Sequence, residues 1–270
     1  MKISHFTAIS IVLLAAIIFA GCMSEQAQPK NAEEELTVFV AASLTGALTD
    51  IAKQYEILHP NIRIITNFDG SQALRTQIEQ GADADLFLSA NTKQMNALRD
   101  QGLMENGSIT LFAKNKLAVI TPASNPGNIT TLHDLARPGI RLVIGTKDVP
   151  VGDYARQILN KMANDPAYGP SYNTSVLANV MSEETAVTGV VAKVLLGEAD
   201  AGIVYTSDIT PENRDRFIVI PIPDTFNVIA EYPAGIVAAS QHKEEAAAFL
   251  AYLRGEQGRA TLAKYGFALP

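Results

Sequence analysis

Short apolar runs alternate along the chain with stretches in which apolar residues recur at helical spacing. Apolar residues at i, i+3, i+4 and i+7 predict amphipathic helices, most clearly over residues 43–57, 187–195 and 246–253. Alternation of this kind predicts an α/β fold with largely parallel sheets. The predicted strands cover residues 36–42, 62–68, 84–90, 141–146 and 201–207.

Two longer extended segments indicate that the chain builds two lobes. Residues 110–122 form a long extended run interrupted by polar residues, and residues 231–240 form a possible return. If both are crossovers, one lobe consists of residues 36–115 plus 232–270, and the other is the insert 116–231. The alternative is one continuous, doubly wound sheet.

Four predicted helices begin directly after a strand, and their first residues include Ser43, Ser71, Val151 and Val187. Pro150 favours a helix start just before Val151. The first N–H groups of a helix lack intrahelical acceptors and carry partial positive charge. We expect the two serines to act as N-caps. If the four helix ends converge beyond the strands, they form an anion site without lysine or arginine.

Enzymatic chemistry has little support in the sequence. The histidines are scattered, and there is no GxSxG, HExxH, GxxxxGK[ST] or GxGxxG motif. Asp83 and Asp85 resemble a paired-carboxylate metal site, but we expect them to be solvated turn residues. We therefore predict that the protein is not an enzyme. A secreted metal-dependent hydrolase using Asp83, Asp85 or Glu184 is the alternative.

The N-terminus has the pattern of a secretory signal. Lys2 precedes an apolar core at residues 8–20, and the core ends in "FAGC" at Cys22. We predict a signal peptide at 1–21, lipidation of Cys22, and a flexible polar tether over 22–35. An uncleaved anchor helix or a free thiol is the alternative. Because Cys22 is the only cysteine, the chain cannot form an internal disulfide.

Composition narrows the possible partners. Apolar residues make up 47% of the chain, as expected of an ordinary globular protein. Without Lys2, 20 basic and 28 acidic side chains remain, which gives a net charge of −8. There is no basic stripe, so we do not expect nucleic-acid binding. Sequons at Asn106, Asn128 and Asn173 are either glycan acceptors or ordinary polar loop residues.

Five segments stand out by their order and spacing along the chain. They are "VFVAASLTGALTDIA", "DGSQALRTQIEQGADADLFLSA", "DVPVGDYA", "GEADAGIVYTSD" and "AAAFLAYLRGEQGRATLAKYGF". Together they resemble one known family, the molybdate-binding proteins of ABC importers, over essentially all of residues 36–270. The resemblance implies a periplasmic-binding-protein-like fold of type II, with mostly parallel sheets, flanking helices and the ligand between two lobes.

The resemblance also implies a set of neutral donors for a tetrahedral oxyanion. Ser43 and Ser71 would each supply a hydroxyl and a backbone N–H. Val151 and Val187 would supply backbone N–H groups, and Tyr205 would supply its phenolic O–H. The molybdenum or tungsten would then be held only through the oxyanion oxygens, and no cofactor is implied.

Two details of this site stay open at the level of sequence. Ala186 or Thr188 could take the place of Val187. A related receptor type adds carboxylates and makes the metal six-coordinate, although we favour four-coordinate binding. The carboxylates near enough to act in this way are Asp148, Asp153 and Glu184.

The family resemblance implies the partners as well. The receptor would be a monomer, anchored at the outer face of the cell membrane through Cys22. It would pass molybdate or tungstate to a membrane permease and its ATPase. A receptor for another anion such as sulfate, or for a chelated metal, is the alternative within the binding class.

Overall fold

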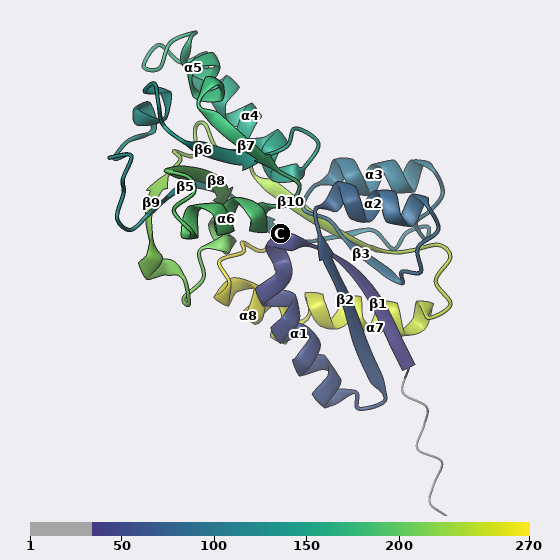
Figure 1. Cartoon of the computed structure of the whole chain (residues 1–270). Coiled ribbons are helices and arrows are strands. Elements are labelled where there is room, and N and C mark those ends of the chain that lie inside the picture. Colours follow the sequence, from purple (N-terminus) through teal and green to yellow (C-terminus); the bar gives the residue numbers. More distant parts are fainter. Residues whose placement is uncertain (1–33) are drawn as a thin grey trace, which may run out of the picture. The chain divides into compact units, whose positions relative to one another are not determined.

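The computed structural model describes residues 34–270, which form two five-stranded sheets flanked by helices (Figure 1). The predicted signal peptide and Cys22 lie outside the described residues, as does most of the predicted tether. Strand β1 begins at Glu34, so the last two residues assigned to that tether belong to the fold. Over the described range, no helix has the length and apolar character needed to cross a membrane.

The first sheet has the strand order β2-β1-β3-β10-β4. Its strands are β1 (Glu34–Ala41), β2 (Ile62–Asp69), β3 (Leu86–Leu88), β4 (Thr110–Asn115) and β10 (Ala230–Ile236). β10 runs antiparallel to both of its neighbours, whereas β1, β2 and β3 are parallel. The helices of this half are α1 (Thr45–Leu58), α2 (Ser71–Glu79), α3 (Thr92–Asp100), α7 (Lys243–Arg254) and α8 (Glu256–Lys264).

Helices cover both faces of this sheet, as the continuous apolar run in β1 requires. Val38 and Val40 belong to the core cluster that includes α1 and α7. Phe39, between them, packs in a second cluster with Leu74 of α2 and Leu98 of α3. Neighbouring residues of a strand point to opposite faces, so β1 buries side chains on both sides.

The second sheet has the order β7-β6-β8-β5-β9. Its strands are β5 (Leu117–Pro122), β6 (Leu142–Gly145), β7 (Val180–Glu184), β8 (Ala201–Tyr205) and β9 (Phe217–Pro221). β5 is antiparallel to both neighbours, and β6, β7 and β8 are parallel. The accompanying helices are α4 (Pro150–Ala163), α5 (Tyr172–Ala178) and α6 (Val187–Leu195).

The chain changes sheets at two places. Lys116 alone separates β4 from β5, and residues 222–229 separate β9 from β10. The predicted two-lobed α/β fold is confirmed, and the alternative of one continuous sheet is wrong. The lobe boundaries remain a proposal. The second boundary, predicted between residues 231 and 232, fits the strand pairing better if it is placed before Ala230, because β10 pairs with β4 from that residue onward.

Two strands were not predicted, and both lie at an edge of the second sheet. β7 contains "SEE" and exposes Met181, while β9 exposes Ile218. Edge strands are covered less completely than central ones, so their apolar pattern is weaker. The predicted strand 84–90 is also shorter than expected, since only Leu86–Leu88 pair as β3.

Candidate functional site

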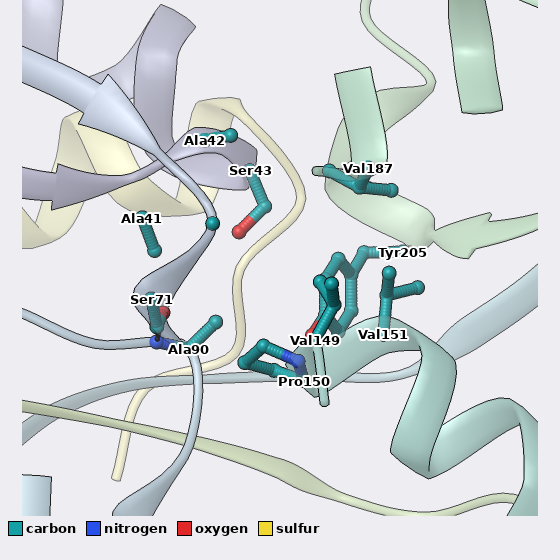
Figure 2. Close-up of a pocket in the computed structure, with 11 residues that line it drawn as sticks. Ala41, Ala42, Ser43, Ser71, Ala90, Val149, Pro150, Val151, Val187 and Tyr205 are labelled. Atoms are coloured by element: carbon teal, nitrogen blue, oxygen red, sulfur yellow. Dashed lines mark hydrogen bonds between the residues drawn. The ribbon is translucent and has the colours of Figure 1, made fainter. Parts of the chain in front are cut away.

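The five residues singled out from sequence line a single pocket. Figure 2 shows Ser43 and Ser71 on one side of it, and Val151, Val187 and Tyr205 on the other. Ser43 and Ser71 follow β1 and β2 of the first sheet, while the other three follow or end strands of the second sheet. The pocket therefore lies beyond the carboxyl ends of parallel strands from both sheets, where α/β folds commonly bind ligands.

The pocket is small and carries no charge of its own. Its empty volume is about 210 Å³, part of it open to solvent. No lysine, arginine, aspartate or glutamate of residues 34–270 lines it. The remaining lining residues are Ala41, Ala42, Gly70, Ala90, Val149 and Pro150.

Ser43 does not cap a helix, so the expectation from sequence is wrong at this position. It lies inside a 3-10 turn, Ala42–Leu44, and α1 begins only at Thr45. The Ser43 hydroxyl lies 2.9 Å from the hydroxyl of Tyr232 in β10. Sequence reasoning missed Tyr232, because no local pattern links residues so far apart in the chain.

Ser71 is not a cap either. It is the first residue of α2, the N-cap is Gly70, and no side chain caps this helix. The Ser71 Oγ accepts a hydrogen bond of 3.0 Å from the backbone N–H of Ala90. A backbone N–H can only donate, so the hydroxyl hydrogen of Ser71 is left to point elsewhere. The pocket is where an acceptor would receive it.

Two further helices direct their N-termini at the pocket. α4 begins with Pro150 and continues with Val151, and Val187 is the first residue of α6. The N–H groups of Val151 and Val187 belong to the first turns, where no intrahelical acceptor exists. Each helix end adds partial positive charge to an otherwise neutral pocket.

The two sides of the pocket touch at Gly70. A Cβ atom on Gly70 would lie 2.3 Å from the backbone oxygen of Thr185, in the segment that leads into α6. Gln72 donates a 2.9 Å hydrogen bond from Nε2 to that same oxygen. Only glycine allows this approach, which brings the start of α2 against the start of α6.

Tyr205 supplies the most unusual polar group of the pocket. Its side chain is 1% exposed, and its hydroxyl has no hydrogen-bond partner among the described residues. Burial raises the pKa of Tyr205 well above its ordinary value, so the group stays protonated and can donate. A buried hydroxyl without a partner costs free energy that a bound acceptor would recover.

Other candidates from sequence lie elsewhere. Neither Ala186 nor Thr188 lines this pocket, whereas Val187 does. The possible additional ligands Asp148, Asp153 and Glu184 are also absent from the lining. Glu184 is instead paired with Lys193 at 2.7 Å. The geometry thus favours a ligand held by neutral groups.

The paired aspartates do not form a metal site. Asp85 is buried and accepts hydrogen bonds from the Thr37 backbone N–H at 2.8 Å and from the Ser240 hydroxyl at 2.6 Å. The expectation that Asp85 is a solvated turn residue is therefore wrong, because its carboxylate joins three segments of the first lobe. Over residues 34–270 no cluster of three histidine, cysteine or acidic side chains is placed to hold a metal ion.

Two mixed sheets and a neutral, donor-lined pocket at the ends of their parallel strands are the features of a two-lobed solute receptor. The family of bacterial extracellular solute-binding proteins matches residues 36–268. The chain belongs to this family, and the resemblance recognised in its sequence is confirmed.

Individual relatives agree with this assignment. The molybdate-binding protein ModA of Mycobacterium tuberculosis is 34% identical over 265 residues, which cover 97% of this chain and 96% of the relative. A putative ABC transporter substrate-binding lipoprotein, YvgL of Bacillus subtilis, is 32% identical and covers 94% of this chain and 95% of its own. Among solved structures, the substrate-binding domain of a putative molybdenum ABC transporter from Clostridium difficile is 29% identical, with a TM-score of 0.65. It covers 87% of this chain and 99% of its own.

Proposed function

We propose that the protein is an extracytoplasmic receptor that binds molybdate, and tungstate with it, and delivers the anion to an ABC importer. The observation that carries the proposal is the donor set of the pocket. Three residues with hydroxyls, Ser43, Ser71 and Tyr205, line one small space together with the helix starts at Val151 and Val187. In this proposal all five bind the oxyanion.

A doubly charged tetrahedral oxyanion suits such a pocket. It presents only acceptor oxygens, and hydrogen bonds to charged acceptors are stronger than those between neutral groups. A protonated anion such as hydrogen phosphate must also donate a proton. The described lining has no acidic side chain to receive it, so the site discriminates against that class.

The choice of molybdate over sulfate rests on the relatives rather than on the donor chemistry. Sulfate and molybdate share charge and shape, so the donors identified above serve both. Two of the three named relatives are described as molybdate-binding or as part of a putative molybdenum transporter, and this favours a group 6 oxyanion. Sulfate is therefore the principal competitor in any test.

The remaining parts of the proposal concern transport. The open receptor captures the anion and closes by bending where the chain changes sheets, at Lys116 and at residues 222–229. The closed form then docks on the permease whose ATPase drives import. Cleavage before Cys22 and lipidation of its sulfur hold the receptor, as a monomer, at the outer face of the membrane. No resident cofactor takes part.

Calorimetric titration of the purified protein with molybdate, tungstate, sulfate and phosphate tests the proposal. We expect one anion per chain for molybdate and tungstate, weaker binding of sulfate, and no heat of binding with phosphate. If only sulfate binds, the proposal of a molybdate receptor is wrong and the transported anion is sulfate. Absence of binding to any of the four, together with stoichiometric zinc or manganese in the purified protein, would favour the hydrolase alternative.

A further inference from the structure

A buried series of hydrogen bonds, here called the relay, links Ser43 of the pocket through Tyr232 to Asn115. Asn115 lies where the polypeptide passes from the first sheet to the second. The Ser43 hydroxyl lies 2.9 Å from the Tyr232 hydroxyl, and Asn115 Nδ2 lies 3.4 Å from that same hydroxyl. Asn115 is the last residue of β4 and precedes Lys116, where the chain passes to the second sheet. Asn115 and Tyr232 are both buried.

The orientation of the Asn115 amide is fixed by its other partners. Its Oδ1 accepts from the backbone N–H of Lys116 at 2.9 Å and from the hydroxyl of Thr206 at 2.7 Å. A backbone N–H has no acceptor role, so the atom that receives it is the amide oxygen. The other amide atom is then the nitrogen, which donates to Ser207 Oγ at 2.7 Å and to the Tyr232 hydroxyl.

This orientation decides the direction of the next bonds. The Asn115 nitrogen can only donate, so the Tyr232 oxygen accepts from it. Among the hydrogen-bond partners of Tyr232 in the described residues, Ser43 Oγ is then the only acceptor, and we assign the Tyr232 hydrogen to it. Ser43 Oγ is then occupied as an acceptor, so its own hydrogen points to a different partner. Ser71 is in the same situation, because Ala90 N–H occupies its oxygen. Each serine oxygen therefore already accepts one hydrogen bond, and its own hydrogen is left for a bound acceptor.

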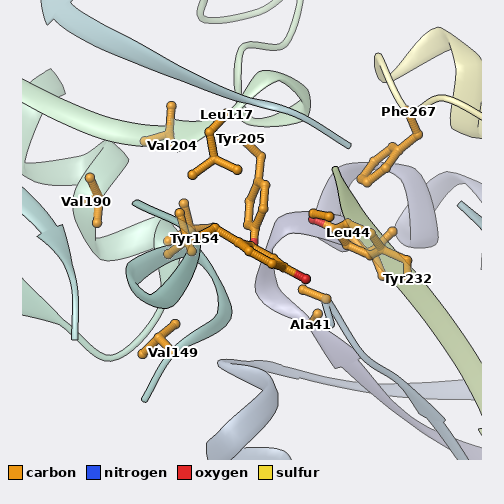
Figure 3. Packing of buried hydrophobic residues seen from close by; sticks show 14 of the residues in the cluster. Ala41, Leu44, Leu117, Val149, Tyr154, Val190, Val204, Tyr205, Tyr232 and Phe267 are labelled. Atoms are coloured by element: carbon orange, nitrogen blue, oxygen red, sulfur yellow. The ribbon is translucent and has the colours of Figure 1, made fainter. Parts of the chain in front are cut away.

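We propose that Asn115 and Tyr232 are positioning residues that fix Ser43 as a hydrogen-bond donor to the bound anion. The inference rests on the proposed function, since it concerns the same pocket. Neither residue lines the pocket; each acts through Ser43. Figure 3 shows Tyr232 beside Tyr205, and the two ring centroids are 5.9 Å apart.

The relay also connects the two sides of the pocket. Ser43 and Tyr232 belong to the first sheet and its connections, whereas Thr206 and Ser207 directly follow Tyr205 at the end of β8. Asn115 is hydrogen-bonded to both groups of residues, to Tyr232 on one side and to Thr206 and Ser207 on the other. The donor state of Ser43 is therefore tied to the contact between the end of β4 and the turn after β8.

The direct test is a variant that reverses the direction of the hydrogen bonds from Asn115 to Tyr232 and from Tyr232 to Ser43. In Asn115→Asp, the carboxylate only accepts, so Tyr232 donates to it and Ser43 donates to Tyr232. A Ser43 lone pair then faces the anion. At pH 8, calorimetry should show about a 3–10-fold loss of molybdate affinity for Tyr232→Phe and a loss of more than 30-fold for Asn115→Asp. The double variant should bind at least threefold more tightly than Asn115→Asp, because without the Tyr232 hydroxyl nothing holds Ser43 in the wrong direction.

A double variant as weak as Asn115→Asp, or weaker, would overturn the proposal, because charge or misfolding alone would then explain the loss. If Asn115→Asp does not fold, displacement of molybdate by phosphate from Tyr232→Phe decides the matter. Loss of the Tyr232 hydroxyl leaves both lone pairs of Ser43 without a donor among the described residues, so Ser43 can more readily accept the proton of hydrogen phosphate, and the preference for molybdate should fall at least threefold. An unchanged preference would contradict the relay.

A matched control is Tyr265→Phe, which removes a hydroxyl bonded to Asp50 at 2.8 Å outside this pocket. It should bind molybdate as the wild type does, and reduced binding by this variant would overturn the assignment to Tyr232. Failure of the wild-type protein to bind molybdate or tungstate would reject the proposed function itself. Wild-type binding without an effect of Tyr232→Phe would reject only the relay.

Discussion

The hydroxyl of Ser43 lies 2.9 Å from that of Tyr232, although 189 residues separate them in the chain. Ser43 stands at the end of the first strand, and Tyr232 lies on the strand that enters the first sheet after the second is complete. The position of the Ser43 hydroxyl thus depends on both connections between the sheets, at Lys116 and at residues 222–229. Its geometry is a property of the whole fold rather than of a local motif.

Removal of either serine hydroxyl should weaken binding. Ser43→Ala and Ser71→Ala each take one donor from the anion, and the loss of a partner to a charged group costs about 1–3 kcal/mol, or about 5–150-fold in affinity. Molybdate titration measures the change. Ser124→Ala, at an exposed loop position, is the control and should bind normally. Wild-type affinity in both pocket variants would remove these hydroxyls from the site.

Tyr205→Phe should separate binding from stability. The Tyr205 hydroxyl has no partner among the described residues, so its removal breaks no hydrogen bond within them. We expect the free energy of unfolding without ligand to be unchanged or higher by up to about 1 kcal/mol. Molybdate affinity should fall about tenfold or more. If Tyr205→Phe has a lower free energy of unfolding but binds molybdate like the wild type, the Tyr205 hydroxyl stabilises the fold and does not bind the anion.

A backbone donor can be tested by proline at Val187. This residue opens α6, where proline is accepted, and the preceding Ala186 has the extended backbone that proline favours. Val187→Pro removes one N–H that has no intrahelical acceptor, so anion affinity should fall about tenfold. Because the buried Val187 side chain is lost as well, the free energy of unfolding is compared with that of Val187→Ala, from which it should differ by no more than about 1 kcal/mol.

Val187→Ala keeps the N–H and is the matched control. It should bind within about threefold of the wild type, because only side-chain methyl groups are lost. Equal binding by the proline and alanine variants would show that this N–H does not contact the anion.

The pH dependence of stability should reveal Asp208. Asp208 is half-buried as a residue, but its carboxyl is enclosed by protein, and this desolvation raises its pKa to about 8, against the opposing effect of its hydrogen bond from the Tyr205 backbone N–H. Between its ordinary value of 3.8 and about 8, the unfolded chain releases this proton and the folded chain keeps it. The contribution of Asp208 is therefore fully present below about pH 4, and the free energy of unfolding falls as the pH rises to about 8.

Chemical unfolding of the wild type and Asp208→Asn across this range measures the effect. The difference between the two proteins isolates Asp208 from other carboxylates, such as Asp134, whose pKa is lowered to about 2 by backbone hydrogen bonds. We expect Asp208→Asn to show the flatter profile. Parallel profiles would mean that Asp208 is ionised in the folded protein.

The sequence predicted those parts of the molecule that local patterns encode. Apolar runs predicted most strands, and Pro150 indicated the start of α4. The convergence of Ser43, Ser71, Val151, Val187 and Tyr205 on one pocket was expected from the family resemblance, and the structure brings these residues together.

Long-range contacts explain why some predictions from the sequence were wrong or missing. A serine after a strand is typical of a cap, but Ser43 bonds to Tyr232 and Ser71 to Ala90, neither of which is near in sequence. Asp85 looked like a turn residue because Ser240, its buried partner, is 155 residues away. Asn115 gave no signal, since its role depends on where the second sheet places Thr206 and Ser207.

Anomalous diffraction at the molybdenum edge, from crystals grown with molybdate, locates the bound metal without reference to any variant. We expect one strong peak per chain, centred between the hydroxyls of Ser43, Ser71 and Tyr205 and the helix starts at Val151 and Val187. Four oxygens should surround the metal, without a carboxylate from the protein. A peak elsewhere, a six-coordinate metal with an acidic ligand, or no peak at saturating molybdate would contradict the proposed binding site.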